Sequence, residues 1–273
     1  MTPDTQIRII AGTNIGLIRK KNEDNFILNP DNSLSDWFMP TDVSKPIKLG
    51  NVGCTIAVAD GMGGANCGEV ASALTVECVK NAFESADLPN IIQSDLAIID
   101  FLKRIVLTAD LTIKQYAADH PESKGMGTTL VLGWLLGRVM HIVWCGDSRV
   151  YVYHPQRGLR RLSKDHSRVQ SYIDQGLLTE DTAFGHPESN IITRCIGDVP
   201  KTADADYFLY EVQPSDTFLF CTDGLSAYCP DEEISQVMEE TCSQLNTCRN
   251  ELINHALQAG GYDNVTVALL SVE

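Results

Sequence analysis

Basic residues are scarce in this sequence of 273 residues. Lys and Arg number 21 against 36 Asp and Glu, so the formal net charge is −15 at pH 7. Such an acidic surface repels phosphate backbones and anionic membranes, which argues against a nucleic-acid-binding protein. Most of these carboxylates have a simpler explanation as charges that keep a protein in solution.

Long apolar runs are missing as well. The longest, near Leu130–Gly137, stops at Arg138, far short of the ~20 residues that a membrane-spanning helix needs. The residues Met1–Arg8 are polar and lack the apolar core of a secretion signal. We therefore expect neither membrane insertion nor secretion by that route.

Metal and nucleotide motifs built on cysteine, histidine or lysine are absent. The nine cysteines include no CxxC pair, and no HExxH is present, which disfavours zinc. The glycines between Gly61 and Gly68 do not spell GxxxxGK[ST], so nucleotide binding there is unsupported. An odd number of unclustered cysteines, most of them inside apolar runs, predicts reduced thiols and a cytoplasmic protein.

What is present is an ordinary globular composition, with 44% hydrophobic and 21% charged residues. Short apolar runs predict strands. These runs are Ile7–Ala11, Phe26–Leu28, Cys54–Ala59, Thr128–Leu136, Val139–Cys145, Val150–Tyr153, Phe208–Val212, Phe218–Cys221 and Val265–Leu270. Gly137 and Arg138 separate two of them as a hairpin turn, and the polar stretch Asn29–Asn51 predicts a long loop.

A different spacing predicts helices. In Ser94–His120 apolar residues recur at steps of three and four, with Ser94 as the N-cap and Pro121 as the stop. Further helices are expected at Gly68–Phe83, Asp231–Glu240 and Leu245–Ala259. Two blocks of helices among many strands favour an α+β fold, or helices flanking a β-sandwich, over regular βαβ alternation.

Carboxylates recur where the predicted strands begin or end. They are Glu23 with Asp24, Asp60 before Gly61, Asp147 after Gly146, Asp223 before Gly224, and Asp263 before Asn264. Any one Asp-Gly pair is most simply a turn, and spacing alone does not show that the five sites converge. Converging carboxylates need cations to ionise together, and ligands that are all oxygen suit Mg²⁺ or Mn²⁺. Two such ions can activate a water and hold a phosphoryl group.

Arg19 lies five residues before Asp24. A guanidinium binds a phosphate through two parallel hydrogen bonds, although a solvated surface charge explains this arginine equally well. The residues alone thus indicate a hydrolase candidate with a carboxylate-bound metal pair, and they leave a phosphate substrate open.

The order of these motifs resembles that of the type 2C, metal-dependent protein serine/threonine phosphatases, in particular their bacterial branch. Eight segments carry the resemblance across nearly the whole chain. They are Gly16–Arg19 with Asn22–Asp24, Val58–Gly64 with Gly68–Ser72, Gly125–Thr129, Gly146–Tyr151, Leu162–Ser167, Ile191–Arg194, Thr222–Ser226 and Asp263–Thr266. One such motif would be weak, whereas eight in family order are specific.

The resemblance implies a fold as well as roles for individual residues. The fold would be a central β-sandwich of two antiparallel sheets flanked by helices on both faces, in four layers. Residues 1–273 would form a single catalytic domain, with a flap subdomain at about 164–201. Asp60 would bridge two Mn²⁺ or Mg²⁺ ions, with the Gly61 carbonyl on one of them.

Further roles follow from the same resemblance. Asp223 and Asp263 would hold the second ion, and Asp147 would join Asp223 at a weaker third ion. Glu23 and Asp24 would hold metal-bound waters, with Asn264 beside them just outside the ligands. Arg19 would grip the substrate phosphate.

The implied reaction is attack of a metal-activated water on the phosphorus of a phosphoserine or phosphothreonine, without a phosphoenzyme. The substrates would be proteins phosphorylated by a Ser/Thr kinase in signal transduction, and the enzyme would be a monomer. The alternatives are a catalytically silent module that binds a phosphoprotein, or a phosphatase of small phosphate esters. Silence is disfavoured because Asp60, Asp223 and Asp263 are all present.

Three positions depart from the family pattern. Met62 stands where animal members place a His proposed as a general acid, so the leaving group must take its proton from a metal-bound water or another group. Ala65 stands where some bacterial relatives carry a His near the substrate. Ala227 stands where many relatives have an Asp that helps to hold the third ion, which weakens the expected third site.

Other polar residues have structural explanations. Thr128 and Thr129 are expected to be strand and packing residues rather than nucleophiles. Ser148 lacks a G-x-S-x-G frame because Val150 occupies its last position. For His166 a structural or flap hydrogen-bonding role is favoured over a catalytic one.

Overall fold

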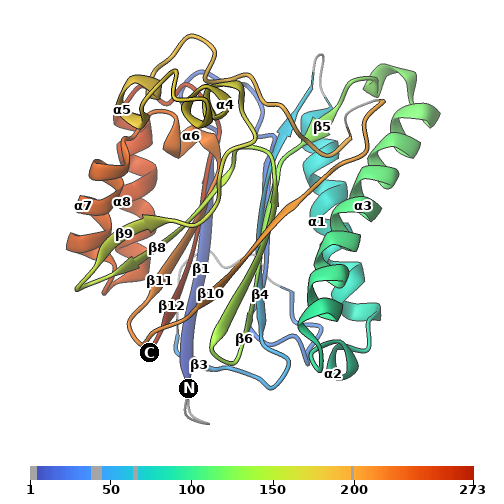
Figure 1. Cartoon of the computed structure of the whole chain (residues 1–273), viewed down its shortest axis with the longest axis vertical. Helices are drawn as coiled ribbons and strands as arrows, with labels where there is room; N and C mark the ends of the chain where they lie inside the picture. Colours follow the sequence, from blue (N-terminus) through green and yellow to red (C-terminus); the bar gives the residue numbers. More distant parts are fainter. Residues whose placement is uncertain (1–4, 38–44, 64–66, 198–199) are drawn as a thin grey trace.

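Two six-stranded sheets pack face to face between two layers of helices (Figure 1). The computed structural model describes residues 5–37, 45–63, 67–197 and 200–273. All strand pairs recorded within and between these segments are antiparallel. The four-layer α+β sandwich expected from the sequence is therefore confirmed.

The first sheet joins strands from both ends of the chain. Its spatial order is β3–β1–β12–β11–β8–β9. The bounds are β1 Gln6–Asn14, β3 Ile47–Lys48, β8 Arg149–His154, β9 Gly158–Arg161, β11 Thr217–Cys221 and β12 Val265–Val272. Helices α7 and α8 cover its outer face (Figure 1).

The second sheet has the order β10–β7–β6–β4–β2, with β5 paired to the end of β4. The bounds are β2 Asp24–Asn29, β4 Cys54–Met62, β5 Gly127–Thr128, β6 Leu130–Leu136, β7 Val139–Cys145 and β10 Asp206–Glu211. Helices α1 and α3 cover its outer face (Figure 1).

The helices lie in the two blocks that the sequence predicts, with short additions between them. Their bounds are α1 Gly68–Ser85, α2 Leu88–Ile91, α3 Asp95–Asp119, η1 Pro121–Ser123, α4 Arg168–Asp174, α5 Glu180–Ala183, α6 Asp223–Ser226, α7 Asp231–Thr241 and α8 Leu245–Gln258. Ser94 caps α3 as expected, because its hydroxyl accepts a hydrogen bond from the Ala97 amide at 3.4 Å. No helix of the described segments is long and apolar enough to cross a membrane.

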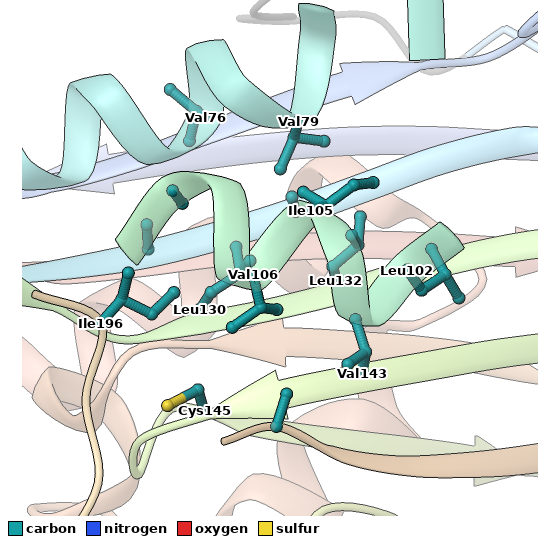
Figure 2. Close-up of a cluster of buried hydrophobic side chains, with 14 of the residues drawn as sticks. Val76, Val79, Leu102, Ile105, Val106, Leu130, Leu132, Val143, Cys145 and Ile196 are labelled. Atoms are coloured by element: carbon teal, nitrogen blue, oxygen red, sulfur yellow. The ribbon is translucent and has the colours of Figure 1, made fainter. Parts of the chain in front are cut away.

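Both faces of the central strands are buried, which explains why β4, β6, β7, β11 and β12 are largely apolar. Along β4, Ile56 and Val58 pack between the two sheets, while Ala57 and Ala59 face the helices. Figure 2 shows how α1 and α3 meet this outer face. Val76 and Val79 of α1, with Leu102, Ile105 and Val106 of α3, pack on Leu130, Leu132 and Val143.

Some expected boundaries were wrong for physical reasons. The run Thr128–Leu136 is two strands, because the Thr129 amide donates to the Asp60 carbonyl instead of continuing one ladder. The short strand β3 lies inside the stretch expected to be loop, of which residues 38–44 are outside the described segments. The polar strand β9 has no apolar run to reveal it.

Candidate active site

The predicted site residues lie at one end of the sandwich, where strand ends from both sheets meet. Asp24 starts β2, Asp60 lies near the end of β4, and Asp147 follows β7. Asp223 follows β11 at the start of α6, and Asp263 precedes β12. This is the end at which β5 and α6 are labelled in Figure 1. Asp24 and Asp60 face one another in the β2–β4 register.

Two threonines fix the backbone of Asp60. The Asp60 amide donates to Oγ1 of Thr129 at 3.0 Å, and the Asp60 carbonyl accepts from Oγ1 of Thr128 at 2.8 Å. The Thr129 hydroxyl is also 2.6 Å from that of Ser148. All three hydroxyls are buried and engaged in these contacts. They therefore position Asp60, which agrees with the expectation that Thr128 and Thr129 are not nucleophiles.

Asp24 ties the two sheets together at the site. Its Oδ2 accepts hydrogen bonds from the hydroxyls of Thr222 at 2.8 Å and Thr266 at 2.7 Å. Its Oδ1 is buried and has no hydrogen-bond partner within the described structure. Burial, opposed by the two threonine bonds and assisted by Asp223 and Asp263, raises the pKa of Asp24 to about 7.

The other carboxyl groups respond to one another in the same way. Removal from water, together with the neighbouring Asp24 and Asp223, raises the pKa of Asp60 well above its usual range. Burial followed by the charge of Asp263 raises the pKa of Asp223, and burial followed by the charge of Asp223 raises that of Asp147. Carboxyls so placed ionise together only beside positive charge.

The loop carrying Asp147 is held from two sides. Gly146 adopts a φ of +114°, and a Cβ there would lie 2.5 Å from Cγ2 of Thr129, so only glycine fits. The Gly146 amide donates to Nδ1 of His166 at 3.1 Å, and the His166 amide donates to the Gly146 carbonyl at 2.9 Å. His166 is buried against Trp144, with ring centroids 6.2 Å apart. These contacts give His166 a structural hydrogen-bonding role, which is the role that the sequence analysis favoured.

Asn264 fastens the loop that carries Arg19 and Glu23. Its Oδ1 accepts from the Glu23 amide at 2.8 Å, and its Nδ2 donates to the carbonyls of Ile15 and Lys21, both at 2.9 Å. This places Arg19 against the neighbouring carboxylate, with Nη2 at 2.6 Å from Oδ2 of Asp263. That hydrogen bond is the main cause that raises the pKa of Arg19.

Gly61 lies where the chain has no room for a side chain. A Cβ at this position would lie 2.2 Å from the Gly68 carbonyl oxygen and 2.5 Å from that of Glu23. The Gly61 amide donates to that Glu23 carbonyl at 3.1 Å. This hydrogen bond keeps Glu23 beside Gly61, as expected if both residues belong to one metal site. The expected departure at Ala65 lies outside the described residues.

The residues fit hard divalent cations in type and in charge. The donors are carboxylate and carbonyl oxygens, Asp24 presents an unpartnered buried oxygen, and the carboxyl groups raise one another's pKa although Arg19 lies beside them. In geometry they are not yet a closed ligand set, because no three Asp, Glu, His or Cys side chains of the described residues stand close enough to hold an ion.

The hydrogen bonds of the Thr222, Thr266 and Ser148 hydroxyls were not predicted from the sequence. Thr222 and Thr266 lie inside the recognised motifs, so the motifs located them without showing what their hydroxyls bind. Arg149 was missed in the same way. It is held against Asp165 through three hydrogen bonds of 2.7–3.1 Å just beyond Asp147.

A family model described as protein phosphatase 2C matches residues 45–259 of this chain. The chain belongs to the protein phosphatase 2C family. It is 32% identical to the serine/threonine phosphatase stp of Listeria monocytogenes over 260 residues, which cover 94% of this chain and 93% of that protein. The 2C-type chain is thus a metal-dependent serine/threonine protein phosphatase.

Solved structures of serine/threonine phosphatases agree with this assignment. The serine/threonine phosphatase Stp1 from Staphylococcus aureus matches with a TM-score of 0.83 at 28% identity, covering 100% of this chain and 98% of that one. The catalytic domain of PstP, solved in complex with two manganese ions, matches with a TM-score of 0.76 at 27% identity, covering 98% and 99%.

Proposed function

We propose that this phosphatase hydrolyses phosphoserine and phosphothreonine in proteins at a binuclear Mn²⁺ or Mg²⁺ centre. The observation that supports the site most directly is the meeting of Asp60, Asp223 and Asp263 at one end of the sandwich, with the Asp60 backbone fixed by Thr128 and Thr129. The two manganese ions in PstP support the choice of metal.

Each residue has a separate task in this proposal. Asp60 would be a ligand of both ions and the Gly61 carbonyl of one, while Asp223 and Asp263 would hold the second. Asp147 with Asp223 forms a weaker third site, because Ala227 supplies no carboxylate there. Glu23 and Asp24 hold waters at the ions, and Asn264 keeps Glu23 in place.

The protein supplies binding and orientation, and the bound ions supply Lewis acidity that activates a water and neutralises phosphate charge. Arg19 exchanges its contact with Asp263 for the phosphate oxygens, which a guanidinium can bind through two parallel hydrogen bonds. Met62 carries no titratable group, so the leaving serine or threonine oxygen takes its proton from water or from another side chain.

The remaining parts of the proposal concern the whole enzyme. Residues 1–273 act as one catalytic domain in which 164–201 is a flap that contributes to substrate choice. The phosphatase opposes a Ser/Thr kinase as a monomer in the cytoplasm. No disulfide joins the cysteines of the described residues, which supports a reducing compartment.

The test is phosphate release from a phosphothreonine peptide with Mn²⁺, repeated with excess EDTA. We expect release that EDTA stops and that Asp60→Asn abolishes, because the substitution removes a charged ligand while leaving the backbone clamp. Glu84→Gln, an exposed acid on α1, is the matched control and should keep full turnover. Full turnover by Asp60→Asn would reject the site assignment.

The alternatives predict different results. A folded wild-type protein that releases no phosphate with any divalent ion would be a silent module that binds phosphoproteins. Turnover confined to free phosphorylated metabolites would indicate a phosphatase of small phosphate esters.

A further inference from the structure

Four exposed apolar side chains lie on the two loops that carry Arg19 and Asp263. Ile15 is 39% exposed, Leu17 66%, Ile18 63% and Tyr262 53%. Single exposed apolar residues are ordinary on a protein surface, whereas several around one functional group mark a binding surface. We call these four residues the apolar rim.

The apolar rim is built from two loops that are fastened together. The Leu17 amide donates to the Gly261 carbonyl at 2.7 Å, and Asn264 donates to the Ile15 carbonyl at 2.9 Å. The Leu17 side chain lies over Gly261, since a Cβ on that glycine would be 2.7 Å from Cγ of Leu17. The rim therefore holds its shape before any partner binds, which lowers the entropy cost of binding.

An aromatic pair connects the rim to the carboxylates. The rings of Tyr262 and Tyr228 lie 5.4 Å apart between centroids. Tyr228 is half-buried, and its pKa is raised by burial and then by the charges of Asp223 and Asp263. The aromatic surface therefore extends from the exposed Tyr262 to the half-buried Tyr228.

Arg19 connects the rim to the phosphate position. It follows Ile18 directly and its guanidinium lies against Asp263, the residue after Tyr262. A phosphate on Arg19 therefore has rim side chains on both of the loops next to it. An extended peptide advances about 3.3 Å per residue, so its neighbouring side chains reach the rim within roughly three residues of the phosphate.

We propose that the apolar rim binds apolar side chains flanking the phosphorylated residue of a protein substrate, and so selects phosphorylation sites in apolar sequence surroundings. The proposal rests on the proposed function, because it assigns the flanking contacts of the same site. The occupant is a segment of the substrate rather than a second copy of the chain, because the rim borders the arginine that binds the phosphate.

The experiment compares two phosphothreonine peptides of equal length and charge. In one, leucine and valine flank the phosphothreonine for three residues on each side, and in the other serine replaces them. With Mn²⁺ we expect kcat/KM to be roughly tenfold higher for the apolar peptide. Burial of one leucine side chain of the peptide against the rim would account for a ratio of this size. In the double variant Leu17→Ser, Ile18→Ser this ratio should fall to near one.

Leu111→Ser is the matched control, because Leu111 on α3 is 67% exposed and distant from Arg19 in sequence. It should keep the wild-type ratio. The proposal would be overturned if the wild type had equal kcat/KM on both peptides. It would also be overturned if the double variant kept the wild-type ratio. The wild-type comparison stands even if the double variant fails to fold. Hydrolysis of neither peptide by folded wild type would instead count against the proposed function.

Discussion

Arg19 and Asp263 form an ion pair between groups to which the proposal assigns different partners. The arginine side chain is 51% exposed and that of the aspartate 23% exposed. An ion pair this close to water contributes little to stability, so either partner can leave it at small cost. The pair thus keeps the guanidinium beside the place where we expect the phosphate.

Arg19→Ala should raise KM for a phosphothreonine peptide by roughly tenfold or more, as loss of a charge-assisted hydrogen bond worth about 1–3 kcal/mol predicts. The KM of Arg19→Lys should lie between those of the wild type and Arg19→Ala, because an ammonium group keeps the charge but lacks the planar guanidinium that forms two parallel hydrogen bonds. Steady-state kinetics with Mn²⁺ measure both. Arg138→Ala, in the exposed β6–β7 turn, should leave KM unchanged. An unchanged KM in Arg19→Ala would reject its phosphate role.

At this scale the sequence indicated which residues are site candidates, but it did not show which distant residues they contact. Asp60, Asp223 and Asp263 could be named as candidates because each stands in a recognised motif beside a glycine or asparagine. The hydroxyl of Thr266 was not assigned a partner, because Thr is also an ordinary β-strand residue. Its bond to Asp24 joins residues 242 positions apart, which a single sequence does not show.

At the scale of elements, α3 does more than cover a sheet. Asp110 on its buried side is 1% exposed and accepts hydrogen bonds from the amides of Gly197 at 2.8 Å and Ala203 at 3.3 Å. Lys114 pairs with the same carboxylate at 2.7 Å. Gly197 and Ala203 are thereby joined to the helix. Ile196, which precedes Gly197, forms a β-bridge with Thr128.

Asp110→Ala should lower the free energy of unfolding by about 2–4 kcal/mol, because two buried backbone amides lose their acceptor. Urea denaturation followed by circular dichroism measures the change. Asp100→Ala, at an exposed position of the same helix, should change it by less than about 0.5 kcal/mol. Equal stability of the two variants would show that the carboxylate does not hold this segment.

Helix periodicity predicted α3 but not this contact. The stripe of Val106, Ala109 and Ile113 marks the face that packs on the sheet, and Asp110 adjoins it as a charged residue. A pattern of apolar residues gives the direction of a buried face. It does not show which distant backbone amides a buried carboxylate meets. The short strands β3 and β9 escaped prediction because they bury few apolar side chains.

At the scale of the whole molecule, the net charge of −15 and the clustered carboxyls oppose folding when no cation is bound. Cations that bind the folded site alone stabilise it, by about 2.7 kcal/mol at one hundred times Kd. A substitution that removes a metal ligand should therefore remove this stabilisation.

Mn²⁺ should therefore raise Tm by several degrees, the shift that a stabilisation of this size gives in a domain of this length. Differential scanning fluorimetry at constant ionic strength, with NaCl as the comparison, measures the shift. Glu84→Gln should keep the full shift, and Asp60→Asn should lose most of it. A shift that survives Asp60→Asn would place the stabilising ion elsewhere.

The pairing of β1 with β12 joins residues from opposite ends of the described chain, with Ile7 opposite Val272. The same separation joins Arg19 to Asp263, 244 positions later. A ribosome releases Arg19 long before Asp263, so β1 waits without its neighbour while the rest is synthesised. A nascent chain that ends before residue 263 lacks both β12 and the carboxylate that contacts Arg19, so it lacks part of the site that we propose.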